Sequence, residues 1–589
     1  MPRAMTMPPI RHTPLLLALV LAGCYDGAGS DGADTSGSTG ATAGTTPGTG
    51  DGDGDDGGTP TGGDTDDVTT GGEPASCEPL RSPLRRLSRT ELTNTLADLF
   101  PTITLPEIDL PADKPKDLFG NSVDTQEPTD VYVETHWRAT VTVAAAVAAD
   151  LPGVMGCSLG DDAARQACAD TYVPLLLRRA FRRPVAQAEV DRYLADFLPT
   201  QWGEHGFDTA MQLLVTAVLN SPSFLYRAEF GAEGADAAAT LPLRAEELAV
   251  RLSYFLWQTM PDDTLAAATE SGVLDTPAGL EAEARRMLAD PRARVATADF
   301  HRQWLGLDGL QAIERDETLF PAWNPTLAPI MAESLRRYVE YAFWDGEGTL
   351  ASLLLDPIAF ANAALAPIYG VQAEGEELAL VSLDGAQRAG LLTQPALMAS
   401  MAHEKFDAPI KRGVYVLDRF MCVGLGAPPP NVPDIPPADA NDGPKTTRQR
   451  IEETHVQESC KSCHTLIDGV GFAFNNYDAI GQWRTTENGL PIDATGALMG
   501  TAGITANFDG ALVLSQLLAD SPDVERCFGR QVFRFAQGRR EGARGVGHVE
   551  RSGNLQVRVH RPAVGQDDVG AVDAEAGLGL VQRAARAVP

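Results

Sequence analysis

Apolar residues recur at helical spacing through most of the chain beyond residue 76, and few segments alternate between apolar and polar positions. In the segment 244–257, Leu248, Leu252 and Phe255 lie three or four residues apart, which gives a helix one apolar face. Met260-Pro261-Asp262-Asp263 ends that pattern with residues typical of a helix boundary. The same periodicity predicts helices at residues 84–100, 172–181, 190–198, 279–288 and 331–344. The pattern therefore predicts a mainly α fold built from several helical domains.

The N-terminus has the pattern of an exported bacterial lipoprotein. Arg3 and Arg11 precede an apolar run at residues 15–22, which is too short to span a bilayer but suits a signal peptide. The run ends in Leu21-Ala22-Gly23-Cys24, which resembles a lipobox, so cleavage is expected before a lipidated Cys24. Because several acyl chains anchor a protein stably, we expect lipid anchoring to the cell envelope, on the periplasmic side or the cell surface. The alternative is an ordinary secretory signal followed by an incidental cysteine.

A low-complexity segment follows this signal. Residues 25–76 hold eleven acidic residues and no Lys or Arg, and consist almost entirely of Gly, Asp, Thr, Ser, Ala and Pro. Such a composition cannot bury enough apolar surface to fold, so it predicts a disordered acidic tether. The formal net charge of the whole chain is −33, which argues against nucleic acid as a partner.

The pentapeptide Cys460-Lys461-Ser462-Cys463-His464 carries the clearest chemistry in the sequence. Two cysteines at this spacing can each form a thioether with one vinyl group of a porphyrin, and the adjacent histidine can bind the iron. The motif therefore predicts one haem c, attached through Cys460 and Cys463, with His464 as the proximal iron ligand.

Several residues are candidates for the other side of that haem. Met499 is the methionine that follows the motif, and a methionine ligand would favour electron transfer. Its alternative role is ordinary packing in a turn-rich segment. The remaining candidates are three histidines, which are equally consistent with structural roles, and three aromatic residues that could line a porphyrin or simply a core: His301, His403, His455, Phe472, Tyr477 and Trp483.

Two other interpretations of the cysteine pair stay open. A structural zinc site could use His455, Cys460, Cys463 and His464, although a histidine directly after the second cysteine does not fit the usual spacing. A disulfide or thiol-redox pair is the simpler alternative, although no βαβ pattern surrounds it.

Other acidic and basic clusters have plain structural explanations. Asp262 and Asp263 could act as paired acids in glycoside hydrolysis, but they more simply cap the next helix. The arginines within 178–183 could bind an anion, but a solvated helix end explains them as well.

The remaining cysteines fit an oxidising, exported compartment. Cys157 and Cys168 are close in sequence and could form one disulfide, and Cys422 and Cys527 could join the two ends of the region around the cysteine motif. Cys77 is then left over. The sequence alone does not fix this connectivity.

Leu84-Arg85-Arg86-Leu87-Ser88-Arg89-Thr90-Glu91 resembles the opening block of a known family. Its members are multidomain secreted proteins of unknown function with a cytochrome-c-like CxxCH region, abundant in planctomycetes and myxobacteria. Later blocks resemble the same family over about residues 80–540, at 178–184, 251–263, 285–292, 408–413, 460–481 and 533–539. The resemblance implies export, a helical build and a c-type haem signature, but no established activity.

Two departures from that family stand out. Where the family tends to have Asp-Pro and a glutamate-asparagine pair, this chain has Asp468-Gly469 and Asn475-Asn476. The resemblance also stops after Arg540, and residues 541–589 contain no Phe, Tyr or Trp to build a core. We expect this tail to be poorly ordered, and a frameshift is one explanation for it.

These patterns divide the chain into eight predicted segments: a signal peptide at 1–23, a linker at 24–76, helical domains at 77–165, 166–235 and 236–380, a cytochrome-c-like domain at 381–488, a C-terminal family domain at 489–540 and the tail at 541–589. We expect an extracytoplasmic c-type haem protein that acts in electron transfer or in an oxidative, peroxidase-like reaction with an unidentified redox partner or substrate. The competing expectation is a non-catalytic, surface-binding or structural lipoprotein whose CxxC forms a disulfide.

Overall fold

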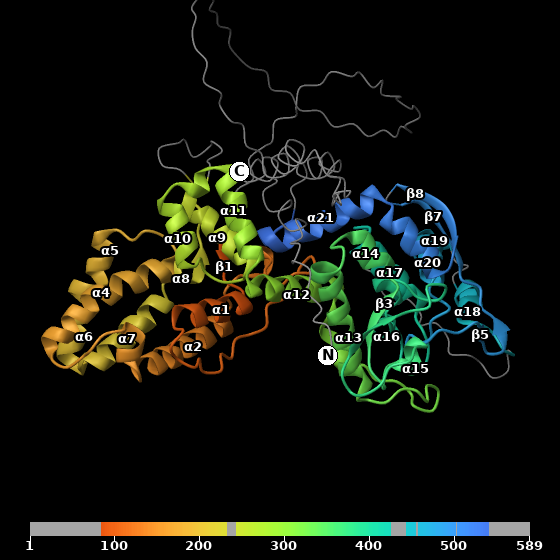
Figure 1. Ribbon diagram of the computed structural model, residues 1–589, viewed down its shortest axis with the longest axis horizontal. Helices are drawn as coiled ribbons and strands as arrows, with labels where there is room; N and C mark the ends of the chain where they lie inside the picture. The colour runs from red at the N-terminus through yellow and green to blue at the C-terminus, as the bar shows by residue number, and fades with distance from the viewer. Residues whose placement is uncertain (1–83, 232–242, 426–442, 455–457, 502, 541–589) are drawn as a thin grey trace, which may run out of the picture.

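The computed structural model describes residues 84–231, 243–425, 443–454, 458–501 and 503–540. The predicted signal peptide, Cys24, the linker, Cys77, His455 and the tail lie outside these residues, and within 458–463 only the backbone is described. The described chain is mainly helical, with four antiparallel two-stranded sheets. Its helices form two lobes with separate apolar cores (Figure 1). The predicted mainly α, multidomain fold is confirmed.

The N-terminal lobe contains the first eight α-helices, one π-helical turn and one sheet. Its elements are β1 (Arg85–Arg86), α1 (Arg89–Leu99), α2 (Asp130–Ala148), α3 (Leu151–Met155), α4 (Asp162–Phe181), α5 (Gln187–Asp191), the π-helix η3 (Arg192–Phe197), α6 (Leu198–His205), α7 (Phe207–Leu219), α8 (Pro222–Leu225) and β2 (Tyr226–Arg227), with the short turn η2 (Val123–Thr125). The expected helices at 172–181 and 190–198 are present as parts of α4 and of the α5–α6 run.

The expected helix at 84–100 begins later than the periodicity suggested. Arg85 and Arg86 form β1, which pairs antiparallel with β2, and the helix starts only at Arg89. Ser88 caps it by accepting a hydrogen bond from the Glu91 amide, while Glu91 accepts one from the Ser88 amide. This reciprocal capping box satisfies two amides that the first turn cannot pair, and so fixes the helix start.

The middle of the chain forms a helical layer beside the N-terminal lobe and then crosses to the second lobe (Figure 1). Its elements are α9 (Ala245–Leu256), α10 (Asp263–Glu270), η4 (Val273–Asp275), α11 (Pro277–Leu288), α12 (Pro291–Leu305), η5 (Leu307–Ala312), α13 (Leu327–Glu340), the π-helix η6 (Tyr341–Asp345), α14 (Leu350–Leu355), β3 (Ile358–Ala361), α15 (Ala366–Tyr369) and β4 (Ala379–Ser382). The expected helices at 244–257, 279–288 and 331–344 are confirmed. Asp262 accepts a hydrogen bond from the Leu265 amide and caps α10, which confirms the structural interpretation of that acidic pair.

The C-terminal lobe is completed by η7 (Leu391–Thr393), α16 (Pro395–Ser400), α17 (Pro409–Arg419), α18 (Thr447–Thr454), α19 (Glu458–Phe472), β5 (Thr486–Glu487), β6 (Leu490–Pro491), β7 (Thr495–Thr501), β8 (Ile504–Asp509), α20 (Gly510–Ala519) and α21 (Pro522–Gln537). The last of the described helices, α21, runs back from the C-terminal lobe towards the N-terminal one (Figure 1). There the Asn121 side chain donates to the Phe535 carbonyl at 2.7 Å, and the Val123 amide donates to the Gly538 carbonyl at 2.8 Å.

A buried ionic cluster lies where β1, β2 and α9 meet. Arg85 and Arg251 both bind Glu229, at 3.0 and 2.6 Å, and Arg227 binds Glu91 at 3.0 Å. All five side chains are at most 9% exposed. Burial, followed by the charge of Arg227, lowers the pKa of Arg85 to about 9. The two glutamates therefore compensate the positive charge of the three buried arginines.

Arg182 corrects the expectation of a solvated helix end at 178–183. This residue caps the C-terminus of α4 with a left-handed φ of 55° and is only 8% exposed. Its guanidinium donates to the carbonyl oxygens of Phe224 and Tyr226, at 2.6 and 3.1 Å. The charge at this helix end is thus buried against the α8–β2 connection and does not face solvent.

Two disulfides are present among the described residues, and both join cysteines that the sequence analysis paired. Cys157 and Cys168 have Cα atoms 6.1 Å apart and hold the loop between α3 and α4. Cys422 and Cys527 have Cα atoms 5.5 Å apart and join the end of α17 to α21 across 105 residues of sequence. The second bridge therefore ties the segment before the cysteine motif to the last helix.

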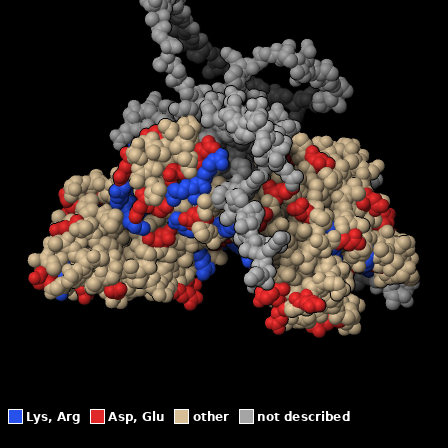
Figure 2. All heavy atoms as spheres, in the orientation of Figure 1, with Lys and Arg blue, Asp and Glu red and all other residues tan. Residues whose placement is uncertain are grey.

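Charged side chains are unevenly spread over the face shown in Figure 2. Basic side chains gather near α10 and α11, whereas acidic ones are scattered over both lobes. Arg286 of α11 and Arg292 at the start of α12 pair with Asp262 and Asp290 at 2.9 and 2.8 Å. The basic region is thus paired with acidic groups of the same chain. Of the described helices, none combines the length and apolar character needed to cross a bilayer.

Candidate functional site

Helix α19 carries the cysteine motif and lies between α17 on one side and the β7–β8 hairpin on the other. Glycines allow this close approach. A Cβ on Gly471 would overlap the Pro409 carbonyl of α17, and a Cβ on Gly496 of β7 would overlap the Gly469 carbonyl of α19. Because neither contact leaves room for a side chain, the position of α19 is fixed on both faces.

His464 is the first residue of the motif whose side chain is described. Its Nδ1 lies 3.0 Å from Oδ1 of Asp468, one helical turn further along α19, and the two side chains are 17% and 13% exposed. A carboxylate oxygen can only accept, so this contact calls for a proton on Nδ1 and leaves the lone pair on Nε2. This arrangement is common among histidines that bind metals, because the carboxylate fixes both ring orientation and tautomer.

A cavity of about 850 Å³ lies beside His464. Residues of α18, α19, the β7–β8 hairpin and α20 line it: Arg448, Glu452, His464, Thr465, Asp468, Gly469, Phe472, Thr495, Gly496, Ala497, Asn507, Phe508, Asp509 and Val513. Its volume falls in the range of about 300–1,000 Å³ that is typical of small-molecule and cofactor sites. The cavity combines apolar walls with a few charged groups.

Arg448 supplies the positive charge at this cavity. Its guanidinium lies 4.5 Å from the Phe472 ring centroid and contacts Glu452 and Asp493 at 2.8 and 3.1 Å. It also donates to the Thr495 carbonyl at 2.7 Å, which links α18 to β7. Arg448 therefore joins two walls of the cavity, and its own charge is balanced by Glu452 and Asp493.

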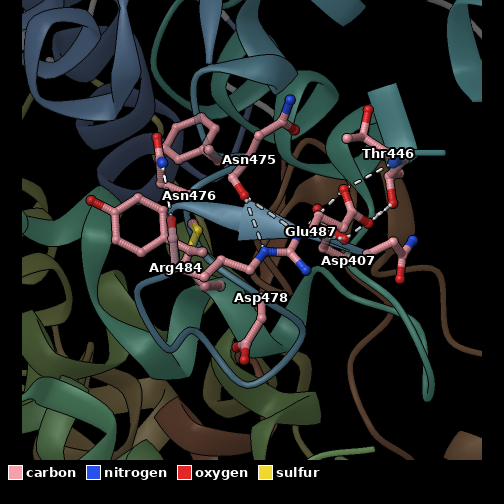
Figure 3. Close-up of polar contacts among 12 residues, drawn as sticks. Asp407, Thr446, Asn475, Asn476, Asp478, Arg484 and Glu487 are labelled. Atoms are coloured by element: carbon pink, nitrogen blue, oxygen red, sulfur yellow. Dashed lines mark hydrogen bonds and ion pairs between the residues drawn. The ribbon is translucent and has the colours of Figure 1, made fainter. Parts of the chain in front are cut away.

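A buried ionic network positions α18. Figure 3 shows Arg484 directed towards Asp407 and Glu487, and its Nη2 lies 3.1 Å from Asp407, which is 1% exposed. Glu487 in turn accepts hydrogen bonds from the amide and hydroxyl of Thr447, at 2.9 and 2.6 Å, at the first residue of α18. The network thus connects α18 to the segment that follows α19.

Three arginines hold the segment 474–481 by its carbonyl oxygens. Arg412 of α17 is fully buried and donates to the carbonyls of Phe474, Tyr477 and Asp478 at 2.8–2.9 Å. Arg315 and Arg388 donate to the carbonyls of Ala479 and Gly481. Burial lowers the pKa of Arg412 to about 10. These bonds lock the backbone that leaves α19, and they need arginine because one guanidinium serves several acceptors.

The other sequence candidates lie at different places. Of the three aromatic residues, only Phe472 lines the cavity, whereas Tyr477 is fully buried and packs edge-on against Trp483 with centroids 5.3 Å apart. Met499 lies on β7 with 67% of its side chain exposed and is not among the lining residues. His301 lies on the buried face of α12, and the His403 ring is tilted against Phe406 with centroids 4.6 Å apart.

The two departures from the family pattern have structural counterparts. Gly469 faces the Ala497 carbonyl of β7, where a Cβ would be only 2.7 Å away. Asn475 donates to the Asp493 carbonyl at 2.9 Å and is 5% exposed. Gly469 therefore packs against β7, and Asn475 binds the segment between β6 and β7.

Sequence reasoning missed Asp468, Arg448 and Arg412 as parts of the site. The spacing of four residues between His464 and Asp468 on one helix is a signal that could have identified the first pair. Arg412 and Arg448 carry no such signal, because their partners are far away in sequence. Among the described residues, no group of three or more His, Cys, Asp or Glu is arranged to hold a metal ion.

Comparison with family models matches four successive segments of the chain. They are PSD3 (DUF1587) at residues 85–149, PSD5 (DUF1595) at 168–229, PSD4 (DUF1592) at 243–371 and PSCyt3 (DUF1588) at 388–487, each described as a protein of unknown function. The chain is a multidomain protein assembled from domains of unknown function. Comparison with curated proteins and with solved structures found no match.

The DUF1588 segment contains one half of the cavity. His464, Asp468 and Arg448 lie within residues 388–487, together with Arg388 and Arg412, whereas Arg315 belongs to the DUF1592 segment. The β7–β8 hairpin and α20, which form the facing wall, lie beyond it. The candidate site is therefore formed between the DUF1588 segment and the helices and strands that follow.

Proposed function

We propose that this chain is a c-type haem protein of the cell envelope that acts in electron transfer or in an oxidative reaction. The observation that carries the proposal is His464, whose Nδ1 contacts Asp468 while its ring borders the cavity of about 850 Å³. The name of the PSCyt3 family, whose model matches residues 388–487, is consistent with a cytochrome-like segment.

The residues present fit a haem. Cys460 and Cys463 would supply the thioether sulfurs from the N-terminal part of α19, and Nε2 of His464 would bind the iron. When bound, haem would supply one-electron exchange at its iron. Phe472 and Phe508 offer apolar contact for a porphyrin face.

Asp468 has a positioning role in this proposal. Its carboxylate would hold the proton on Nδ1 of His464 and so keep Nε2 as the metal-binding nitrogen. Export and lipidation of Cys24 belong to the same proposal, because thioether haem is attached outside the cytoplasm. The acidic surface gives no support to a nucleic-acid partner, and the proposed partners are a membrane and a redox protein or substrate.

The decisive experiment is expression of the full chain in a host that matures cytochromes c, followed by a haem stain of a denaturing gel. We expect stain on the intact polypeptide and its loss in the variant Cys460→Ser/Cys463→Ser. The matched control Cys157→Ser/Cys168→Ser removes a disulfide in the other lobe and should keep the stain. An exported, folded wild-type chain without covalent haem would contradict the proposal.

Asp468→Asn tests the positioning role within a haem-loaded protein. Without the carboxylate, His464 would donate less electron density to the haem iron, which disfavours the oxidised iron. We therefore expect the reduction potential of the haem to rise by about 60 mV, which equals a tenfold change in the equilibrium constant for one-electron reduction. Asp509→Asn is the control, since Asp509 lines the same cavity from the end of β8, on the wall that faces α19. Equal shifts in both variants would reduce the role of Asp468 to its charge alone.

The sixth position of the iron is best probed at Met499. Because this side chain is 67% exposed and outside the cavity lining, we expect Met499→Leu to leave the visible spectrum unchanged. A changed spectrum would identify Met499 as a ligand and favour electron transfer over oxidative chemistry.

The second candidate function is a non-catalytic surface-binding lipoprotein whose Cys460 and Cys463 form a disulfide. The observation that favours it is the pair of disulfides among the described residues, Cys157–Cys168 and Cys422–Cys527, which fit an oxidising compartment. Peptide mapping without reductant separates the two functions, because a Cys460–Cys463 disulfide and two thioethers exclude each other.

A further inference from the structure

A second cavity, of about 330 Å³, lies in the C-terminal lobe between α12 and the α13–η6 helix, away from the His464 site. Seven apolar side chains form much of its wall: Ala298, Leu307, Leu310, Ala332, Val339, Phe343 and Trp344. Its volume is at the lower end of the range for small-molecule sites, which suits a ligand of one or two rings.

His301 is the one histidine that borders this cavity, and its side chain is 3% exposed. Nδ1 lies 2.8 Å from the Thr297 carbonyl, one turn back on α12. The carbonyl can only accept, so Nδ1 carries the proton and Nε2 is an acceptor. Within the described residues, Nε2 has no hydrogen-bond partner. Burial lowers the pKa of His301 to about 4, so the ring is neutral at neutral pH.

The wall of the cavity beside His301 is aromatic. Phe343 packs edge-on against the His301 ring with centroids 5.3 Å apart, and Trp344 lies next to it at 5.2 Å. Both belong to η6, a π-helical turn that continues α13. Such turns redirect side chains within a helix and occur frequently at functional sites.

The charged residues around this cavity balance one another. Arginines 294, 302 and 336 line it together with the carboxylates of Asp299, Glu333 and Glu340. Arg336 contacts both Glu333 and Glu340 at 2.7 Å, and Arg302 contacts Asp299 at 2.6 Å. Because each cation already has an acidic partner, the cavity offers no net charge to a ligand. It favours an uncharged molecule.

We propose that this cavity binds a flat, uncharged aromatic alcohol whose hydroxyl donates to Nε2 of His301. The aromatic ring would pack against Phe343 and Trp344, where edge-to-face contact adds to the burial of apolar area. The hydroxyl would give Nε2 of His301 a donor that no described residue supplies. An aromatic ether of the same shape would leave that acceptor unpaired and bind more weakly.

The test uses the full chain and 2-naphthol, with 2-methoxynaphthalene as a ligand that cannot donate, and calorimetry as the measurement. We expect one 2-naphthol per chain and at least tenfold weaker binding of the ether. His301→Phe should weaken 2-naphthol at least tenfold and bring the two ligands to similar affinity. Ala332→Leu, which fills the cavity, should abolish binding of both.

Three controls keep the result specific. Val295→Ala, on the exposed side of α12, and Ala282→Leu, on the surface of α11, should bind 2-naphthol like the wild type. Cys460→Ser/Cys463→Ser should also bind it normally, which separates this site from the proposed haem site. Circular dichroism verifies the fold of each variant. Unchanged binding in His301→Phe or in Ala332→Leu, or equal affinity of the wild type for both ligands, would overturn the proposal.

Discussion

A histidine can be a metal ligand, an acceptor or a packing group, and its neighbours decide which. His464 and His301 both have Nδ1 bound by an acceptor one helical turn away, a carboxylate in the first case and a backbone carbonyl in the second. In both rings Nε2 is therefore the nitrogen that can accept a hydrogen bond or bind a metal. His301 is the more deeply buried of the two, and its charge state depends on that burial.

The burial of His301 predicts a specific dependence of stability on pH. Its pKa is about 4 in the folded chain and about 6.5 when unfolded, so protons bind the unfolded state preferentially between those values. The stability this residue contributes is present above pH 6.5 and is lost as the pH falls to 4, by about 3 kcal/mol.

Urea unfolding of the wild type and His301→Phe at pH 7 and pH 4 measures this effect. The wild type should lose about 3 kcal/mol more than the variant over that interval. Parallel losses in both proteins would mean that His301 is protonated in the folded state.

At the scale of elements, small residues decide where α19 lies. Gly413 and Gly471 allow α17 and α19 to approach until their backbones touch, and Gly469 and Gly496 do the same between α19 and β7. The site is therefore shaped by residues that contribute no chemistry, and changes in them should act on stability.

Gly471→Ala should destabilise the chain by about 1–3 kcal/mol, because its methyl group would overlap the Pro409 carbonyl. Gly203→Ala is the matched control, since Gly203 lies within α6 and a Cβ there meets nothing within 4 Å. The control should be neutral or stabilising by up to about 1 kcal/mol. Chemical denaturation compares the two, and similar effects would show that the helix contact tolerates a methyl group.

The sequence predicted the helices that have a clear apolar face, and it missed structure that depends on distant partners. The segment 244–257 forms α9 because its periodicity and its boundary agree. Arg85 and Arg86 read as the start of a helix, but they pair with β2, some 140 residues later. The β7–β8 hairpin was also missed, because its strands show weak alternation and its role is to face α19.

The candidate site likewise has one part that could be predicted from the sequence and one part that could not. The cysteine motif is local and could be recognised directly, whereas the cavity wall joins α18, α19, β7–β8 and α20. In the sequence, Arg412 stood out only as part of the segment 408–413 that resembles the family. Its role in binding three carbonyl groups of the segment after α19 could not be predicted from that resemblance.

At the scale of the whole molecule, the buried cluster around Glu229 connects β2 with β1 and α9. Glu229→Gln removes the negative charge between Arg85 and Arg251 and should cost about 3–5 kcal/mol, because two buried guanidinium groups lose their counter-ion. Glu134→Gln is the control, since its pair with Arg138 is 62–71% exposed and should contribute less than about 1 kcal/mol. Thermal unfolding followed by circular dichroism measures both, and an equally small effect of the two substitutions would contradict this account of the cluster.

Helix α21 also has a consequence for how the chain is made. Its C-terminal end binds Asn121 and Val123, and Phe535 packs against Phe119 with centroids 5.5 Å apart, across more than 400 residues of sequence. During synthesis these early residues cannot form their contacts with α21 until more than 400 further residues have emerged, although N-terminal domains generally fold first. The N-terminal lobe can therefore assemble its own core early, but the surface around residues 119–123 is completed only when α21 arrives.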